Sequence, residues 1–371
     1  MTGADLIVAS APGRAGILGN PSDMYGGSVI ACAIDRRAYV AIEPAPVLRL
    51  SALDADLSVE ISAPDDLQLA KPPSSQAAAR LTPLELSSAR RRTYLNILKA
   101  VITQQRMIGE PVHIRCWSEI PPNAGLSSSS ALLVAALRAT DTYLGKTPNL
   151  HRFAETARDI EYTRMGVTCG FQDFYVTTFG GLLYMDFRDK QDWRGPRVDP
   201  LATVETLAGR GDRLPFVLAN TGRQRDSGET HRPLRARWLD GEADVRRTVD
   251  AIGRLARDGK PFILDGVWDQ IAELMRRNQE LIASVGGSGP DNDALVADAL
   301  GHGARAAKLA GAGHGGTIIA LHDDPAVLCE ALRTAGVQLA FPLVYPNPGV
   351  RLEDLPAVPA RAAAVSRRRG L

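Results

Sequence analysis

The chain has 371 residues, 45% of them hydrophobic and 23% charged, and this globular composition excludes wholesale disorder, a collagen-like repeat and a small disulfide scaffold. Lys and Arg number 43 against 42 Asp and Glu, and the net charge of +1 provides no strong field for holding nucleic acid or an anionic membrane. The four cysteines lie far apart without a CxxC pair, which favours reduced thiols over disulfides or a structural zinc site.

The sequence shows no pattern typical of a targeting or membrane-spanning segment. Its start, Met1–Ser10, has no basic stretch followed by a long apolar run, and no later stretch reaches about 18 uncharged apolar residues. We therefore expect a cytoplasmic protein, a monomer or a homodimer, that binds small molecules and neither nucleic acid nor a membrane.

The first third of the chain alternates apolar runs with glycine-rich turns. Strands are predicted at Leu6–Ala9, Ser28–Ala31, Ala38–Ile42 and, by alternation, within residues 48–62. We interpret Gly13–Gly27 as a loop between strands. Farther on, Lys71–Ser88 is rich in Pro, Ser, Ala and Arg and predicts an exposed excursion, and a helical pattern follows at Tyr94–Met107.

The remaining two thirds mix both kinds of element. Strands are predicted at Val112–Ile120, Leu182–Phe187, Pro215–Ala219 and Thr317–Leu321. Helices are predicted at Ala131–Leu144, His151–Arg164, Ala243–Arg257, Phe262–Ser284 and Asp291–Leu300. The polar stretch Arg188–Asp212 indicates a boundary between two lobes.

A loop of glycine and consecutive serines, Gly125–Ala131, lies between a predicted strand and an uncharged helix. Free backbone N–H groups, four hydroxyls and the positive end of the helix converge there, which favours an anion and above all a polyphosphate. A serine hydroxyl can also ligate Mg²⁺. The Lys-Ser/Thr ending of a P-loop is absent, and the residues alone leave open whether the serines only cap the helix.

Two further glycine clusters favour the interpretation as a phosphate site. One follows Ala11–Arg14 near the start of the chain, and the other is Gly311–Gly316. Each cluster adjoins a predicted strand or helix, and three such loops are difficult to explain as ordinary turns.

These three motifs, in this order, resemble those of the GHMP kinases, the family of galactokinase, homoserine kinase, mevalonate kinase and phosphomevalonate kinase. The segment Ala11–Gly27 resembles the galactokinase opening, with Asn20-Pro21 in place of Glu-His. Cys169–Asp173 is similar to the segment that carries the catalytic aspartate of galactokinase.

Other blocks of the sequence resemble one branch of that family, the glucuronokinase-like sugar 1-kinases. They are Gly16–Asp23, Gly125–Ala131, Gln172-Asp173, Gly180–Phe187 and Asp226–Gly241. Several of these positions lie outside the motifs shared by all GHMP kinases, which favours a sugar kinase over a mevalonate-type enzyme.

The resemblance implies an α+β protein with the two-lobed GHMP kinase fold. It implies a ribosomal-S5-like N-terminal lobe in residues 1–200 with the ATP-binding loop, a ferredoxin-like C-terminal lobe in residues 210–350, and a flexible tail in residues 361–371. The implied reaction is the ATP- and Mg²⁺-dependent phosphorylation of a sugar at the anomeric hydroxyl, with glucuronate as the first candidate substrate.

For the nucleotide, the resemblance assigns eleven residues of the second and third motifs. These are Pro122, Gly125, Leu126, Ser127, Ser128, Ser129, Ser130, Ala131, Gly311, Gly313 and Gly315. Ser129 or Ser130 would contact Mg²⁺, and Lys308 and His314 are expected near the phosphates. The position of the Mg²⁺-holding glutamate of galactokinase is Val134 here, so we expect the metal to be held by water or by Asp173.

For the reaction itself, the resemblance makes Asp173 the catalytic base and Arg14 its partner. A carboxylate within hydrogen-bond reach of a sugar hydroxyl can orient and deprotonate it. A fixed cation beside the carboxylate stabilises it and can stabilise charge on the transferring group. From the residues alone, a helix N-cap at Asp173 and a surface charge at Arg14 would be the simpler interpretation.

For the acceptor, the resemblance points to residues of the first motif and of a later polar segment. The candidates are Asn20, Asp23, Tyr25, Arg225 and Asp226, although Asp23 and Asn20 are also common turn residues. A uronic acid would require a cation, preferably a bidentate guanidinium, and Arg223, Arg225 and Arg237 are the candidates that we considered.

Three alternatives stay open at this point. The chain could be a kinase for galactose, arabinose, a heptose or mevalonate. It could be a decarboxylase of the mevalonate branch, which would release carbon dioxide. It could also be a catalytically silent binding protein that keeps the fold.

Overall fold

The computed structural model describes residues 6–70, 83–122, 124–188, 190, 201–207, 213–220, 222, 227–311, 313 and 316–354, with the backbone alone for 83–92, 213 and 227–232. The predictions made for Arg223, Arg225, Asp226, His314, Gly315 and the tail 361–371 lie outside the described residues.

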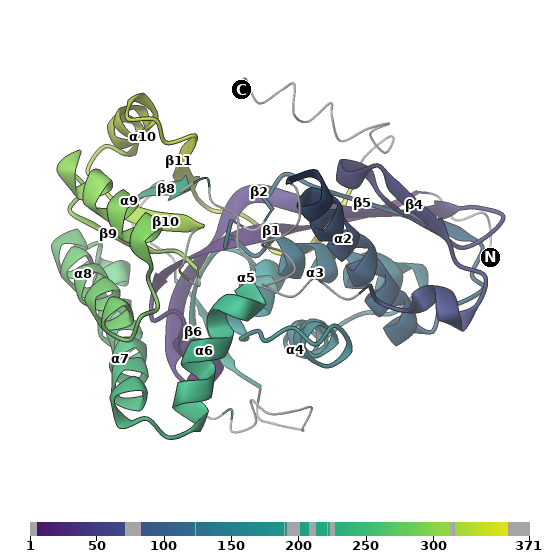
Figure 1. Cartoon of the computed structure of the whole chain (residues 1–371), viewed down its shortest axis with the longest axis horizontal. Coiled ribbons are helices and arrows are strands. Elements are labelled where there is room, and N and C mark those ends of the chain that lie inside the picture. The colour runs from purple at the N-terminus through teal and green to yellow at the C-terminus, as the bar shows by residue number, and fades with distance from the viewer. Residues whose placement is uncertain are drawn as a thin grey trace.

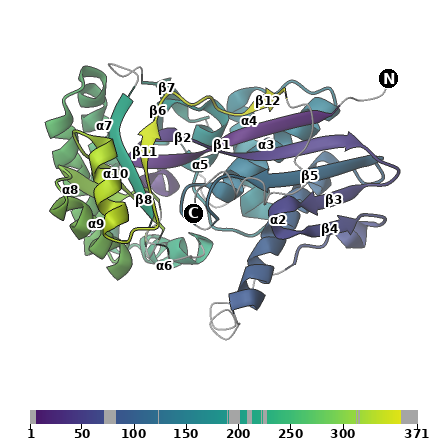
Figure 2. The same ribbon diagram turned by 90° about the horizontal axis from the view of Figure 1, so that it is seen from above.

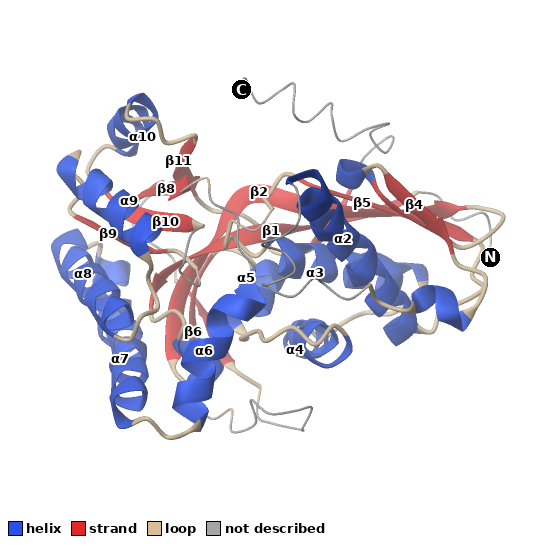
Figure 3. Cartoon of the chain, viewed as in Figure 1, coloured by secondary structure: helices blue, strands red, loops and turns tan. Residues whose placement is uncertain are grey.

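The described chain mixes strands and helices throughout (Figure 3). The strands are β1 (Ile7–Leu18), β2 (Ser28–Pro44), β3 (Arg49–Ala52), β4 (Leu57–Glu60), β5 (Val112–Ser118), β6 (Leu182–Asp186), β7 (Thr203–Thr206), β8 (Arg213–Asn220), β9 (Ala306–Leu309), β10 (Thr317–Leu321), β11 (Leu339–Val344) and β12 (Arg351–Glu353). The α-helices are α2 (Pro83–Gln105), α3 (Ser128–Tyr143), α4 (Leu150–Asp159), α5 (Gln172–Phe179), α6 (Ser227–Leu239), α7 (Ala243–Asp265), α8 (Trp268–Ser284), α9 (Pro290–Gly301) and α10 (Pro325–Thr334). Short 3₁₀ turns lie at Ser22–Tyr25, Leu53–Ala55 and Pro64–Leu67, and a π turn at Ile160–Arg164.

The larger sheet carries the N-terminal half of the protein. Among the described residues its strand order is β12-β1-β2-β5-β3-β4, with β6 paired to β2 and β7 to β6. The pairs are antiparallel except that between β3 and β5. Helix α3 packs on β1 and β2, and α2, α4 and α5 gather around it along one side of the sheet (Figures 1 and 2).

The smaller sheet, β11-β8-β10-β9, is antiparallel and is buried on both faces within the described chain. Phe216 and Leu218 of β8 join the main hydrophobic core, whereas Val217 and Ala219 face a second core under α9 and α10. Burial on both faces explains why this strand reads as an uninterrupted apolar run. Two sheets with helices packed on them confirm the predicted α+β class.

The prediction of a loop over Gly13–Gly27 is wrong for Gly13–Leu18, which belongs to β1. β1 continues to Leu18, with register shifts at Pro12/Arg14 and Gly16/Leu18. A Cβ on Gly13 would lie 2.6 Å from the backbone oxygen of Leu126. The glycine is therefore required by the close approach of another backbone, rather than by a turn.

The helix boundaries also differ from the prediction. α7 runs past Arg257 and through Pro261, and ends at Gly266, whose φ of 69° is left-handed. α2 begins at Pro83, inside the predicted exposed excursion, and α6 was missed because its sequence has no apolar periodicity and contains Pro233. None of the helices in the described part of the chain combines the length and apolarity that crossing a bilayer requires.

Candidate active site

The structure brings the three glycine-rich segments together through backbone contacts. The Arg14 N–H donates to the Leu126 carbonyl over 3.1 Å, and the Gly16 N–H donates to the Ala310 carbonyl over 2.9 Å. A Cβ on Gly311 would lie 2.5 Å from the Gly125 carbonyl oxygen, so the second and third motifs are in direct backbone contact. Residues separated by almost 300 positions in the sequence thus meet at one junction.

Arg14 holds this junction with its side chain, of which 6% is exposed. Nη1 donates to the carbonyls of Gly125 over 2.7 Å and of Ala310 over 3.3 Å. Nε donates to Asp173 Oδ1 over 2.7 Å, and Nη2 lies 2.6 Å from the same oxygen. The predicted pairing of Arg14 with Asp173 is therefore present, and the guanidinium links all three motifs to the carboxylate.

Asp173 lies in the first turn of α5 with 27% of its side chain exposed, and it does not cap that helix. The cap comes instead from Asp23, whose Oδ2 accepts from the N–H groups of Phe171 over 2.8 Å and Gln172 over 3.0 Å. The simpler interpretation of Asp173 as a helix N-cap is therefore wrong. The Asp173 carboxylate instead pairs with Arg14 and is partly exposed to solvent.

The acceptor candidates of the first motif are buried. Asp23 is 2% exposed and also accepts from Gln172 Nε2 over 3.1 Å, so that both of its oxygens have protein donors. Burial raises the pKa of Asp23 to about 6, and the backbone donors at Gln172 and Phe171 oppose that rise. Tyr25 packs against Trp238 with ring centroids 5.3 Å apart, and its hydroxyl is buried without a hydrogen-bond partner.

Asn20 joins the first motif to the third. Its Nδ2 donates to the carbonyls of Leu309 and Gly311 over 3.3 Å each, and its Oδ1 accepts from Lys308 Nζ over 2.7 Å. Lys308 is fully buried, and burial, together with the charge of Arg14, lowers its pKa to about 7. Lys308 is expected near the phosphates, and its ammonium is held by Asn20 and by the neighbouring Leu309 carbonyl.

The serine loop leads into α3, which begins at Ser128. Ser127 has a φ of 61° and makes no side-chain cap bond, and its Oγ is buried without a partner. The closest partner of Ser128 Oγ is Tyr94 Oη at 3.5 Å. Ser129 is partly exposed and Ser130 is buried, whereas Pro122 is exposed and Leu126 is buried. A buried hydroxyl without a partner at the N-terminus of a 16-residue helix fits an anion better than a purely structural cap.

The donors for a metal ion are few. Within the described ranges no group of three or more His, Cys, Asp or Glu side chains is arranged to hold one. Val134 is buried and apolar, so its side chain supplies no ligand for a metal ion. Asp173 and the serine hydroxyls suit Mg²⁺, which proteins commonly hold through one or two side chains together with the phosphates of a nucleotide.

Arg237, a candidate for binding a substrate carboxylate, pairs with Glu242 and donates to the Val285 carbonyl over 2.8 Å.

The structure also reveals a residue that sequence reasoning missed. A different arginine, Arg158, is buried beside Phe171, with Nε and Nη2 lacking partners. Its place at the end of an amphipathic helix gave no sign of this, because the contact that buries it comes from residues beyond the helix.

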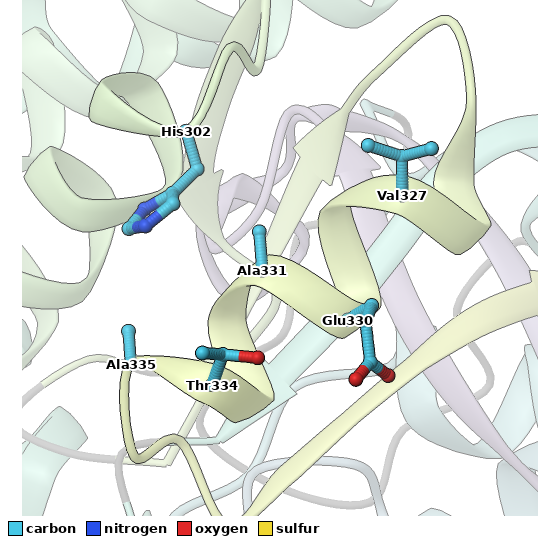
Figure 4. Close-up of a pocket in the computed structure, with 6 residues that line it drawn as sticks. All are labelled: His302, Val327, Glu330, Ala331, Thr334 and Ala335. Carbon is cyan, nitrogen blue, oxygen red and sulfur yellow. The ribbon is translucent and has the colours of Figure 1, made fainter.

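A hollow of about 510 Å³ lies elsewhere, on the outer side of the smaller sheet. Figure 4 shows its lining residues, which are His302, Val327, Glu330, Ala331, Thr334 and Ala335. None of the predicted site residues borders it, and mostly apolar side chains of α10 form its wall. It includes none of the three glycine-rich motifs.

Three sequence profiles match the chain. The "GHMP kinases N terminal domain" covers residues 95–181, the "GHMP kinases C terminal" covers 260–338, and the "Galactokinase galactose-binding signature" covers 2–44. The chain belongs to the GHMP kinase family. It is therefore an ATP-dependent small-molecule kinase, and the matched segments include the serine loop and the third glycine motif.

Relatives of this GHMP kinase differ in their acceptors. It is 27% identical over 360 residues to a mevalonate kinase of Pyrococcus horikoshii, covering 94% of this chain and 98% of that protein. It is 28% identical over 350 residues to glucuronokinase 1 of Arabidopsis thaliana, covering 90% and 91%. The galactokinase of Lactococcus lactis, solved with galactose, superposes with a TM-score of 0.70 at 16% identity, covering 94% of this chain and 95% of that one.

Proposed function

We propose that this GHMP kinase transfers the γ-phosphoryl group of ATP to the anomeric hydroxyl of a sugar acid, with glucuronate as the first candidate, and releases a sugar 1-phosphate and ADP. The observation that carries the proposal is the contact between Arg14 and Asp173 at the junction of the three motifs. The similarity to glucuronokinase 1 over 90% of the chain supports the choice of a uronic acid.

In the proposed reaction Asp173 accepts the proton of the anomeric hydroxyl. The described contacts of its carboxylate engage Oδ1, and 27% of the side chain is exposed. As the sugar oxygen bonds to the γ-phosphorus, the bond from that phosphorus to the β,γ-bridging oxygen breaks and ADP leaves. Arg14 keeps Asp173 in place and adds positive charge where negative charge spreads over the transferring group.

The nucleotide is proposed to bind at the serine loop. Backbone N–H groups at the start of α3, together with the hydroxyls of Ser127–Ser130, would hold the phosphates, and Gly311 and Gly313 would close the other side. Mg²⁺, held by the phosphates with Ser129 or Ser130 and Asp173, would neutralise phosphate charge. The acceptor is proposed to contact Asn20, Asp23, Tyr25, Arg225 and Asp226.

One screen tests this proposal. Free uronic acids, hexoses, pentoses and mevalonate are each incubated with ATP and Mg²⁺, ADP release is measured, and the new phosphate is located by phosphorus NMR. We expect the fastest turnover with a uronic acid and a phosphate ester at the anomeric carbon. Turnover of mevalonate alone, carbon dioxide release, or nucleotide binding without turnover would each reject it.

Mevalonate is the second candidate acceptor. The observation in its favour is the similarity to a mevalonate kinase across 94% of this chain. Mevalonate is also an alcohol that carries a carboxylate, so the same pair of Arg14 and Asp173 would serve it. The screen separates the two candidates directly, because the products are a sugar 1-phosphate and a primary phosphate ester.

A further inference from the structure

A group of aromatic and cationic side chains lies beside Asp23, and we call it the Arg158 cluster. It consists of Tyr25, Arg158, Tyr162, Phe171, Gln172 and Arg235. Asp23 links the cluster to the catalytic pair, because it binds the backbone of Phe171 and Gln172, and its pKa responds to the charges of both Asp173 and Arg14.

Arg158 is the buried centre of this cluster, with 2% of the residue exposed. Its Cζ lies 4.1 Å from the ring centroid of Tyr162 and 4.7 Å from that of Phe171. Tyr162 belongs to the π turn that follows α4, a local irregularity that often occurs at functional sites. The rings thus hold the guanidinium by its faces and leave its edges for hydrogen bonds.

The edges of the guanidinium are unequally used. Nη1 has a weak contact with Asp159 Oδ1 at 3.4 Å, whereas Nε and Nη2 are buried and have no hydrogen-bond partner. Nε–H and Nη2–H point in the same direction and form the edge that binds a carboxylate or a phosphate through two parallel hydrogen bonds. Buried polar groups nearly always have partners, so an unused charged edge calls for one.

Two other members of the Arg158 cluster have unused polar atoms as well. Gln172 Oε1 and the Tyr25 hydroxyl are buried and lack partners. Arg235 Nη2 donates to the Tyr162 hydroxyl over 3.2 Å, and its charge also acts on Tyr25. Burial raises the pKa of the Cys169 thiol, which the charges of Arg158, Asp173 and Asp23 also influence.

The acids near the cluster are already engaged. Glu155 Oε1 accepts from Lys190 Nζ over 2.9 Å and from the Tyr175 hydroxyl over 2.5 Å. Asp159 is partly exposed, and its described contact with Arg158 is the long one to Nη1. Neither acid therefore occupies the Nε/Nη2 edge of Arg158, which has no hydrogen-bond partner.

We propose that the Nε/Nη2 edge of Arg158 binds the carboxylate of the acceptor substrate and so determines the preference for an acidic acceptor over a neutral one. This assignment rests on the proposed function for its acceptor class. It assigns the carboxylate to an arginine that no motif contains, whereas Arg237, a candidate from the sequence, pairs with Glu242. Arg158 is a specificity residue here, and Asp173 and Arg14 keep their roles.

The test compares Arg158→Gln with Arg152→Gln, an exposed arginine on the same helix. Rates at saturating ATP are measured for glucuronate and glucose, and KM is separated from kcat. We expect Arg158→Gln to raise KM for glucuronate about 10- to 100-fold while kcat/KM for glucose stays within about twofold. Arg152→Gln should leave both unchanged. A preference for glucuronate that survives Arg158→Gln overturns the assignment.

A second variant and a binding measurement keep the test decisive if Arg158→Gln folds poorly. Arg158→Lys retains the charge and loses the paired edge, and we expect an intermediate KM for glucuronate. Thermal unfolding of the unaltered chain is followed with glucuronate, glucose and glucose 6-phosphate at equal ionic strength. Stabilisation by glucuronate above the other two supports the assignment. Equal stabilisation by glucose, stabilisation by glucose 6-phosphate instead, or none with any of the three overturns it.

The outcomes also separate this inference from the proposed function. If the unaltered chain phosphorylates mevalonate and no sugar acid, the sugar is wrong, and the same two variants are compared on mevalonate, where a similar rise of KM supports a carboxylate site. If the chain prefers sugar acids and Arg158→Gln retains that preference, the role of Arg158 alone is wrong.

Discussion

The catalytic pair and the Arg158 cluster both adjoin Asp23, but they differ in whether their polar atoms have hydrogen-bond partners. At the pair, the contacts of Arg14 reach two backbone carbonyls and Asp173, so that each of its nitrogens has a partner. In the cluster, Nε and Nη2 of Arg158, Gln172 Oε1 and the Tyr25 hydroxyl have none. A site whose bonds are complete is preorganised for chemistry, whereas one with unused buried donors is suited to recognising a ligand.

We expect the largest effect on activity from a substitution of Asp173 in the catalytic pair. Asp173→Asn should lower kcat about 10²- to 10⁴-fold, because the amide cannot accept the proton of the acceptor hydroxyl. The side chain is partly exposed and the amide oxygen can still meet Arg14, so the free energy of unfolding should change little. Steady-state ADP release and urea unfolding measure the two quantities, with the exposed Asp250→Asn as control. Full turnover by Asp173→Asn would remove the mechanism.

The junction of the motifs can be strained through Gly311. Gly311→Ala places a methyl group 2.5 Å from the Gly125 carbonyl oxygen, and relieving that contact must displace one of the two loops. We expect a loss of about 1–3 kcal/mol in the free energy of unfolding and a rise of at least about tenfold in KM for ATP. Gly301→Ala is the matched control, because its Cβ meets nothing within 4 Å. Equal behaviour of the two variants contradicts the prediction.

Two tyrosines test the contrast between a hydroxyl that has hydrogen-bond partners and one that has none. The Tyr175 hydroxyl donates to Glu155 and accepts from the Ala202 N–H, so Tyr175→Phe should cost about 1–3 kcal/mol of stability and leave the acceptor KM alone. The Tyr25 hydroxyl has no partner, so Tyr25→Phe should retain stability to within about 1 kcal/mol and raise the acceptor KM about fivefold. Chemical denaturation and acceptor kinetics decide, and the reverse pattern would refute the contrast.

Lys308 provides a pH-dependent test of the junction. Burial lowers its pKa from 10.5 to about 7, so between these values the unfolded chain binds more protons than the native one, and stability rises with pH. Below pH 7 the full cost of the buried charge remains. From pH 7 to 9, the stability of Lys308→Met relative to the unaltered chain should fall by about 1 kcal/mol per pH unit. Urea unfolding at three pH values measures this, with Lys99→Met as control, and parallel curves would contradict it.

Much of the fold follows from local pattern. The strand Thr317–Leu321 and the start of α7 at Ala243 were predicted to the residue, because apolar runs and helical periodicity are local signals. Gly13 led to the wrong prediction of a loop, because the absence of a side chain at this position allows the close approach of Leu126, which is 113 positions away. Gly266 ends α7 where Pro261 does not, because the left-handed φ and not the missing N–H stops the helix.

The candidate site likewise contains residues that the sequence indicated and residues that it could not indicate. Family motifs led to Arg14 and Asp173, whose contact the structure contains. The same motifs could not reveal that Asp23 caps α5, nor that Arg158 lies against Phe171, because both contacts join segments that no spacing rule relates. Arg158 became visible only through its unused nitrogens, a property of the packed chain.

Strand β2 has a consequence for how such kinases can be recombined. Its first part, Ser28–Cys32, pairs with β6, and its last part, Ala38–Pro44, pairs with β5, so a single uninterrupted backbone fixes the register of both neighbours. One inserted residue between these parts would reverse which side chains face inward in one of them. Chimeras with relatives should therefore tolerate exchanged side chains along β2 but not a changed length of this strand.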